Sequence, residues 1–300
     1  MRRYMPAALG LIYMAVPLFP SFITFTGATA DNNVSGVLTD GIWEASSTTH
    51  GSTLSITGGA VTEDAATIIL SGTGSIFQAG NGSTFTPLEQ SLGTIDAGAA
   101  LELLNGRGYT TTIGLTDAGL LQLGGGTFKA GALSVAAGGR VLGFGTIADP
   151  VVDGGTIEAA GGKLIVTGKI SGAGGLKIDA SSSLQLQGPV GSGNTVTFAG
   201  NKSALILTDG SAFSGKVSGF GAAASESIDV TTVAFSGATH LTYSSTTDKL
   251  TITNGTHSAA IQLFGQYVAA GFHDASDGGG GTTITYIPPA AHAPALAPHH

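Results

Sequence analysis

The chain has 300 residues, of which 49 are glycine and 10% are charged, and it contains no cysteine. An average globular chain has about 7% glycine and about 25% charged residues, so this composition indicates many tight turns, and a hydrophobic content of 42% argues against global disorder. The formal charge of −8 without a basic stripe argues against nucleic acid as a partner, and the lack of cysteine excludes disulfides and thiolate metal sites.

Residues 1–30 have the order of a secretory signal peptide. A basic start is followed by an apolar run, Ala7 to Ile23, and by the small residues Ala28-Thr29-Ala30. This order predicts export and cleavage after residue 30. The apolar run approaches the length of a membrane span, so an uncleaved anchor is the alternative, but Pro17 and Pro20 interrupt it. We expect contact with a membrane only through this segment, before cleavage.

Residues 31–94 are predicted to form an N-terminal cap and the first, irregular coils of a repeat structure. Short strand patterns such as Thr53–Ile56 and Thr67–Leu70 alternate with turns, and the only tryptophan, Trp43, lies where an end cap is expected. A stack of strands must cover its first rung, because unpaired edges recruit other chains. Leu88–Leu92 is the one short segment with helical character.

Residues 95–212 contain a degenerate repeat of about twenty to thirty residues. Gly125–Phe128 is echoed by Gly154–Ile157, Leu133–Gly139 by Ile157–Gly162, and Leu164–Gly168 by Leu205–Thr208. Such a repeat, rich in Gly and Thr, is typical of a solenoid. The alternation predicts that the apolar positions fill the axis (Ile157, Leu164, Val166, Leu176, Ile178) and that the charged positions point outward (Lys129, Glu158, Lys163, Lys177, Asp179).

The short strands, the repeat and the low aromatic content favour an all-β fold, a single-stranded right-handed parallel β-helix, over an antiparallel sandwich. About ten to twelve coils are expected at the strand spacing of about 4.8 Å. Residues 213–286 have more aromatic side chains and a hairpin signal at Asn254-Gly255 between Leu250–Thr253 and His257–Ile261. They are predicted to form a C-terminal hairpin cap, followed by a disordered Pro/Ala/His tail at 287–300.

These segments resemble the strand-repeat regions of bacterial surface proteins of the autotransporter passenger and filamentous-haemagglutinin-like type. The resemblance is carried by Gly155-Thr-Ile-Glu158, Thr195-Val-Thr-Phe198, the run Phe213–Phe220 and the closing segment Leu250–Ile284, and it covers roughly residues 65 to 286. It implies export to the cell surface or medium and a role in adhesion. The membrane barrel of an autotransporter, with its alternating strands, is not recognised after Tyr286, so self-secretion is not expected.

No catalytic, cofactor or metal site is predicted. Gly278–Gly281 lacks the lysine of a phosphate loop, and His257, His273, Asp274 and Asp277 are typical turn residues as well as conceivable ligands of a divalent ion; His292, His299 and His300 lie in the tail. Acids on one coil face serve β-helix glycosidases and lyases, and Asp153, Glu158 and Asp179 would share a face if a coil had about twenty-one to twenty-six residues.

The sequence therefore predicts an exported structural or adhesive protein rather than an enzyme, secreted or at the bacterial cell surface, with the periplasm as the other location. Its repeated Thr, Ser, Asn and Gln side chains would contact a glycan, a matrix or cells through many weak hydrogen bonds, without a small-molecule cofactor. A carbohydrate-degrading β-helix enzyme, a lyase or glycosidase, is the alternative.

Overall fold

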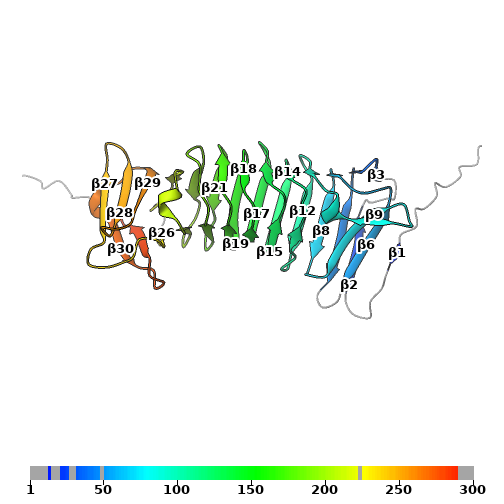
Figure 1. Cartoon of the computed structure of the whole chain (residues 1–300), viewed down its shortest axis with the longest axis horizontal. Helices are drawn as coiled ribbons and strands as arrows, with labels where there is room; N and C mark the ends of the chain where they lie inside the picture. The colour runs from blue at the N-terminus through cyan, green and yellow to red at the C-terminus, as the bar shows by residue number, and fades with distance from the viewer. Residues whose placement is uncertain (1–12, 15–20, 27–31, 48–50, 222–224, 290–300) are drawn as a thin grey trace, which may run out of the picture.

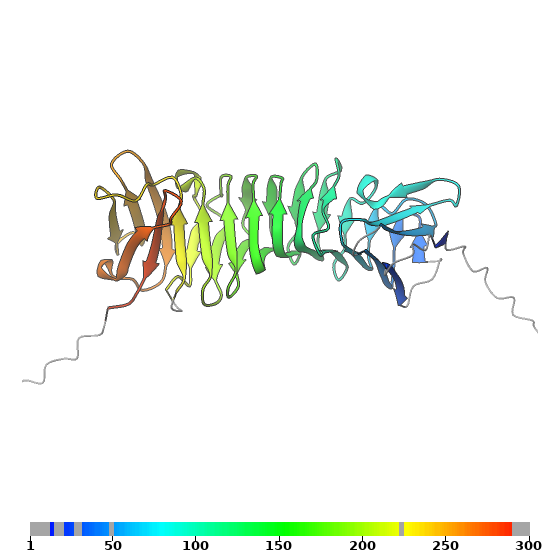
Figure 2. The ribbon, with the colours of Figure 1, turned by 90° about the horizontal axis from the view of Figure 1, so that it is seen from below.

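The computed structural model describes residues 13–14, 21–26, 32–47, 51–221 and 225–289. The predicted fold is confirmed: the described chain forms an all-β solenoid of about nine turns, an elongated rod with the N-terminal segments at one end and the C-terminal segments at the other (Figure 1). Figure 2 shows the same stack from below, with the strands running side by side across the long axis. Most of the predicted signal peptide and of the predicted tail lies outside the described residues.

Three faces surround the axis. The third face is an eight-stranded sheet of short strands: β3 (Asn33–Val34), β4 (Val37–Leu38), β7 (Glu63–Asp64), β11 (Thr94–Ile95), β14 (Leu115–Asp117), β16 (Leu133–Val135), β18 (Val151–Asp153) and β20 (Ile170–Gly172). The first face consists of β5 (Ile42–Ser47), β8 (Thr67–Ser71), β12 (Ala100–Leu104), the first halves of β15 (Leu120–Lys129), β17 (Arg140–Ile147) and β19 (Thr156–Val166), then β21 (Gly175–Ile178), β23 (Thr195–Phe198) and β25 (Lys216–Ser218).

The second face is formed by the second halves of the same long strands. It continues with β22 (Ser183–Leu186), β24 (Ala204–Leu207) and β26 (Ser227–Val230), and β13 (Tyr109–Thr110) precedes it. β19 shows the arrangement: Thr156–Ala159 pairs with β21, whereas Lys163–Val166 pairs with β22. All these pairings are parallel, so each coil is hydrogen-bonded to the coil before and after it.

The axis is apolar because strand side chains alternate between the two sides of a sheet. The five side chains predicted to fill it, Ile157, Leu164, Val166, Leu176 and Ile178, are all 0% exposed. Register places Val141, Ile157, Leu176, Val196 and Val217 in one column. Between Val141 and Val217 one turn therefore takes 16 to 21 residues, at or below the lower end of the repeat predicted from the sequence, whereas the first turns, from Trp43 to Ile68 and from Ile68 to Leu101, take 25 and 33 residues.

Aspartates form the corner between the third and the first face in alternate coils. Asp64, Asp117 and Asp153 occupy the same register position, and Ile95 and Val135 lie between them. Each carboxylate accepts a hydrogen bond from the backbone N–H two residues later, at 2.9 to 3.1 Å. This local bond is the Asx turn that Asp favours, and it turns the chain from one face to the next.

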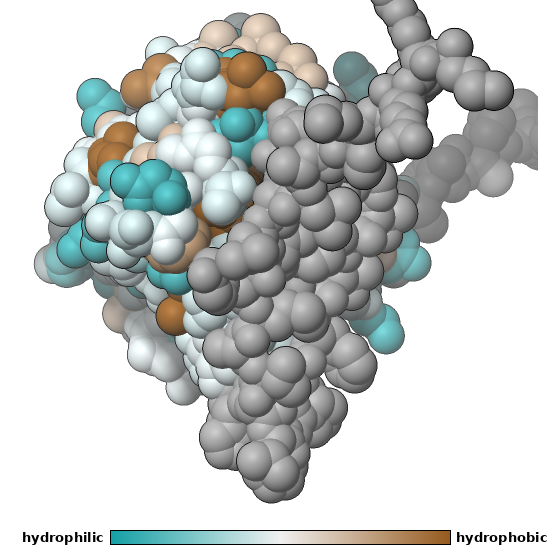
Figure 3. Space-filling model, turned by 90° about the vertical axis from the view of Figure 1, so that its right-hand side faces the viewer, coloured by the Kyte–Doolittle hydropathy of each residue, from teal (hydrophilic) through white to brown (hydrophobic). Residues whose placement is uncertain are grey.

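The N-terminal end is built around Trp43 on β5. Its side chain is 1% exposed and meets the ring of Phe77 edge-on. β2 (Ser21–Thr26) lies antiparallel to β5, and β6 (Ser52–Thr57), β9 (Ser75–Gly80), β10 (Phe85–Pro87) and β1 (Tyr13–Met14) form a small sheet there. Leu88–Gln90 is a single 3-10 turn. Figure 3 shows separate apolar patches, and no continuous apolar face, on the described surface visible from this end.

The C-terminal end is covered by hairpins, as predicted. They are a three-stranded antiparallel meander of β27 (His240–Ser244), β28 (Lys249–Thr253) and β29 (Ser258–Phe264), and the hairpin of β30 (Phe272–Ser276) with β31 (Thr282–Tyr286). β29 pairs in parallel with β25, and β31 pairs antiparallel with β26, so both last solenoid strands are covered. Four aromatic rings, Tyr243, Tyr267, Phe272 and Tyr286, pack together with centroid distances of 4.8 to 6.0 Å.

One local prediction is corrected. The hairpin turn between β28 and β29 is one residue later than Asn254-Gly255, because Asn254 N–H bonds to His257 O at 3.1 Å and leaves Gly255 and Thr256 as the two loop residues. Only Gly255 has a positive φ, +91°, which suits the first central position of a type II′ turn.

No helix in the described part of the chain is long and apolar enough to cross a membrane.

Candidate functional site

The structure separates the three acids considered for carbohydrate cleavage. Asp153 points into the axis from β18, is 0% exposed and accepts hydrogen bonds from Gly155 N (3.1 Å) and Asn194 Nδ2 (3.2 Å). Glu158 lies on the outer side of β19, and Asp179 follows β21. Asp153 therefore shares no face with the other two, because the turn is too short to bring them into line.

Glu158 is more buried than the sequence predicted. It lies on the outer side of the sheet but is only 3% exposed, because Arg140 and Lys177 cover it. Arg140 Nε donates to its carboxylate at 2.9 Å, and Lys177 bridges it to Asp179, with Nζ at 2.9 Å from Asp179 Oδ1. Hydrogen bonds to Glu158 and Asp179 hold the pKa of Lys177 above its ordinary value. This cluster is an ion-pair network in which every charge has a partner.

The histidines and acids near the C-terminus are spread over separate turns. His257 lies in the β28–β29 turn, and His273 is opposite Thr285 in the β30–β31 hairpin. Asp277 accepts hydrogen bonds from Gly279 N and Gly281 N at 2.7 and 2.8 Å, so it stabilises its own loop. Among the described residues, no three His, Cys, Asp or Glu side chains lie together as metal ligands. The tail histidines lie outside the described residues.

Polar side chains on the outside of successive coils are linked by hydrogen bonds. Lys163 Nζ is 3.2 Å from Gln185 Oε1, and Gln185 Nε2 is 3.3 Å from Thr208 Oγ1 one coil later. On the first face, Thr197 and Ser218 share a hydrogen bond of 3.0 Å. We call these five residues the outer ladder. On these coils, hydroxyl, amide and ammonium groups thus lie side by side on the outer surface, above an apolar axis.

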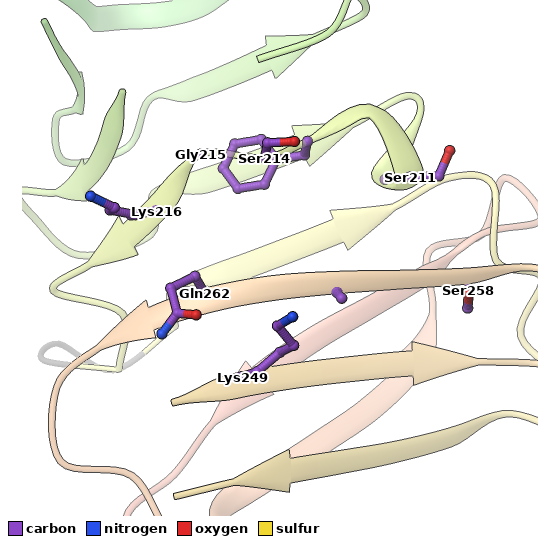
Figure 4. A pocket seen from close by; sticks show the side chains of 10 residues that line it. Ser211, Ser214, Gly215, Lys216, Lys249, Ser258 and Gln262 are labelled. Carbon is purple, nitrogen blue, oxygen red and sulfur yellow. The ribbon is translucent and has the colours of Figure 1, made fainter. Parts of the chain in front are cut away.

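A cleft of about 550 Å³ lies where the solenoid meets its C-terminal cap. One wall is the segment from η3 (Gly210–Ala212) to Lys216, and the other is the exposed side of β28 and β29 (Figure 4). The cleft is lined by Gly210, Ser211, Phe213, Ser214, Gly215, Lys216, Lys249, Ser258, Ala260 and Gln262. Its lining is therefore three serines, two lysines and one amide around small apolar groups, and it contains no carboxylate.

Three of these side chains belong to one cross-strand row. Gln262 on β29 is directly opposite Lys216 on β25 and directly opposite Lys249 on β28. Residues opposite each other in a sheet project from the same side, so the amide stands between the two ammonium groups. Figure 4 shows the three side chains on three successive strands. The two strand steps place the lysine Cα atoms about 10 Å apart.

Contacts hold this row in place. Gln262 Nε2 donates to the backbone carbonyls of Thr247 (2.8 Å) and Asp248 (3.2 Å). Because both donors of the amide are engaged there, its Oε1 is left as an acceptor. Lys216 Nζ lies 5.7 Å from the centroid of the Phe264 ring, within the range of a cation–π contact.

The cleft residues were not identified from the sequence. Lys216 and Lys249 lie on strands separated by two others in the chain, and only the parallel pairing of β25 with β29 brings them together. An alternating strand pattern predicts that each lysine points outward, but it carries no signal for a pairing between strands that are not consecutive.

Comparison with known proteins adds no relative: no protein-family model matches the chain, and no curated protein matches it. The solenoid arrangement is established by the structure, whereas the resemblance to autotransporter passengers and filamentous haemagglutinins remains a resemblance of residue patterns.

Proposed function

We propose that this chain is an exported β-solenoid that presents a repetitive polar surface for contact with glycans, a matrix or cells. The observation that carries the proposal is the outer ladder: polar side chains from successive coils are linked by hydrogen bonds on the outside of the rod. Many weak contacts at regular spacing bind a repetitive partner through avidity, without a single deep pocket. The predicted signal peptide and the resemblance to bacterial surface proteins support the exported location.

Export is tested by expressing the full chain in a Gram-negative bacterial host. We expect the exported protein to begin at Asp31, as measured by intact-mass spectrometry, and to be found outside the cytoplasm in fractionated and protease-treated cells. An intact protein that still begins at Met1 and stays in the cytoplasm would overturn the exported location.

Contact is tested with the purified chain on surfaces coated with glycans, matrix proteins or whole cells. Alanine replacement of Gln185, Thr197 and Ser218 together is expected to weaken retention strongly. The matched control replaces Thr73 and Ser83, which are exposed turn residues away from the ladder. Equal retention of the two variants would count against the ladder as the contact surface.

The same preparation tests the enzyme alternative. The chain is incubated with polysaccharides, and new reducing ends or unsaturated products are measured. Activity that disappears in Asp179→Asn would replace the scaffold proposal by a carbohydrate-degrading enzyme. We expect no such activity, because Asp179 is bridged to Glu158 by Lys177 and Asp153 is enclosed in the axis.

A further inference from the structure

The cleft beside the C-terminal cap concentrates positive charge on an acidic protein. The whole chain has a formal charge of −8, and Arg107, Arg140 and Lys177 are each paired with a carboxylate. Lys216 and Lys249, in contrast, form no ion pair with any residue in the described ranges. Two unneutralised ammonium groups in one concave site favour an anionic ligand.

The acids nearest to the cleft are engaged elsewhere. Asp209 caps η3, where it accepts hydrogen bonds from the Ser211 N–H and hydroxyl at 3.0 and 2.6 Å. Asp248, the neighbour of Lys249, accepts from the Tyr243 hydroxyl at 3.1 Å. Neither carboxylate lines the cleft.

The remaining lining distinguishes a sugar acid from a bare inorganic anion. Ser211, Ser214 and Ser258 are exposed. The Ser211 hydroxyl donates to Asp209 and is left as an acceptor, whereas the hydroxyls of Ser214 and Ser258 can donate and accept. Gln262 presents an acceptor oxygen, which suits a ligand hydroxyl and not a carboxylate or phosphate oxygen. The cleft volume of about 550 Å³ falls within the range of small-molecule sites. Two cations with hydroxyl and amide partners between them match a ring that carries both an acid group and several hydroxyls.

We propose that this cleft binds a carboxylate- or sulfate-bearing sugar of an acidic glycan. Lys216 and Lys249 hold the acid group, while Gln262 and the serines contact the ring hydroxyls. The inference deepens the proposed function, on which it rests, by assigning a ligand class to one end of the rod. The outer ladder then contributes avidity along a chain of such sugars, and the cleft contributes the preference for acidic ones.

The test is isothermal titration of the purified full chain with three probes: a trigalacturonate, which carries carboxylates, a sulfated heparin tetrasaccharide, and a neutral maltotriose. We expect at least one acidic probe to bind, with affinity that falls as salt rises because exposed charge pairs are screened. Lys216→Gln and Lys249→Gln are each expected to weaken it about tenfold, the scale of one charge-assisted hydrogen bond. Whether the carboxylated or the sulfated probe binds more tightly identifies the acid group.

The matched control is the double variant Lys129→Gln/Lys169→Gln, which removes two exposed lysines elsewhere and the same total charge as Lys216→Gln/Lys249→Gln. Circular dichroism and melting check that both double variants fold. Equal affinities of the two double variants, tight binding of maltotriose, or binding of no acidic probe would overturn the cleft proposal. If the Lys216→Gln/Lys249→Gln variant keeps full retention on coated surfaces, the cleft proposal fails while the proposed function stands; if acidic probes bind but the protein stays in the cytoplasm, the proposed function fails alone.

Discussion

Asn194 donates a side-chain hydrogen bond to the buried carboxylate of Asp153, with 3.2 Å between Nδ2 and Oδ2. The two residues are 41 positions apart in the chain, and both are 0% exposed. Asn194 Nδ2 also donates to Gly174 O, which lies between them in sequence, at 3.2 Å. One amide thus ties together separate coils at the corner that ends the third face.

Replacement of Asn194 by alanine is expected to destabilise the fold by about 1 to 3 kcal/mol at pH 7.5, because a buried charged acceptor loses its donor. Burial raises the pKa of Asp153 to about 6, and the amide opposes this rise. At pH 4.5 the carboxyl is protonated, so the loss should be smaller. Urea unfolding at both pH values measures this, with the exposed Asn201→Ala as control. An equal loss at both pH values would contradict the role assigned to the amide.

The three corner aspartates make stability depend on pH in a defined direction. Burial raises the pKa of Asp64 to about 8 and that of Asp117 to about 6. No described residue donates to Oδ2 of either carboxyl. Since these pKa values are raised on folding, the folded state binds more protons than the unfolded state between about pH 4 and pH 8. The contribution of these carboxyl groups to the free energy of unfolding is therefore fully present below pH 4, and it is lost as the pH rises through their folded-state pKa values.

Asp64→Asn tests this directly. Asparagine keeps the oxygen that accepts from Ala66 N at 2.9 Å and carries no charge, so we expect the variant to match the wild type in stability at pH 4 and to exceed it most above pH 8. Between these two pH values, for one linked proton, the wild type should lose about 1.4 kcal/mol per pH unit relative to the variant. Melting temperatures from pH 4 to 9 measure the difference. The control is Asp274→Asn at an exposed position; identical pH profiles for Asp64→Asn and this control would refute the linkage.

Glu158 is expected to contribute a salt-dependent share of stability. Glu158→Gln removes the charge that Arg140 and Lys177 contact, but both partners are 40% or more exposed and regain water. The expected loss is therefore about 1 kcal/mol at low salt, shrinking in 1 M NaCl as the pairs are screened. Urea midpoints at the two salt concentrations provide the measurement. A loss that does not change with salt would mean that packing, and not charge, holds Glu158 in place.

The alternation of apolar and polar residues along each strand was sufficient to predict which side chains fill the axis, because it separates inward from outward side chains within any strand. It does not determine which strands are neighbours. Of the three echoes found in the sequence, only Leu164–Gly168 with Leu205–Thr208 follows the true register, in which Leu184 lies between Leu164 and Leu205. In the second echo, Val135 belongs to the third face whereas Ile157 belongs to the first.

The sequence does not show where the chain turns from one face of the solenoid to the next. An aspartate in a Gly- and Ala-rich stretch is typical of any turn, so the sequence does not distinguish Asp153, which marks a corner and faces the axis, from Asp179, which is half-buried and paired with Lys177. The ion-pair cluster and the cleft also depend on the register between strands. Arg140, Glu158 and Lys177, for example, come from three consecutive coils. Residues brought together only by register are the ones that sequence reasoning missed.

Two glycines at different corners of one coil, Gly138 before β17 and Gly143 within it, test how tightly the coils are stacked. Gly143 has φ +125°, and a Cβ added there would lie 2.0 Å from the backbone oxygen of Leu123 in the preceding coil. Gly138 also has a positive φ, +91°, but a Cβ there would meet nothing within 4 Å. Both positions carry the conformational penalty for a side chain, but only Gly143 adds a clash with backbone that cannot move alone.

Gly138→Ala is therefore expected to cost about 1 to 2 kcal/mol, the price of a left-handed backbone at one residue. Gly143→Ala is expected to cost more than about 4 kcal/mol, in the range reserved for strain and overpacking, because neighbouring coils must separate. Urea unfolding compares how much free energy of unfolding each variant loses. Backbone hydrogen exchange should become faster in β15 and β17 for Gly143→Ala only. If the two variants lost the same stability and exchanged alike, the close approach of these coils would not be the reason that glycine occupies position 143.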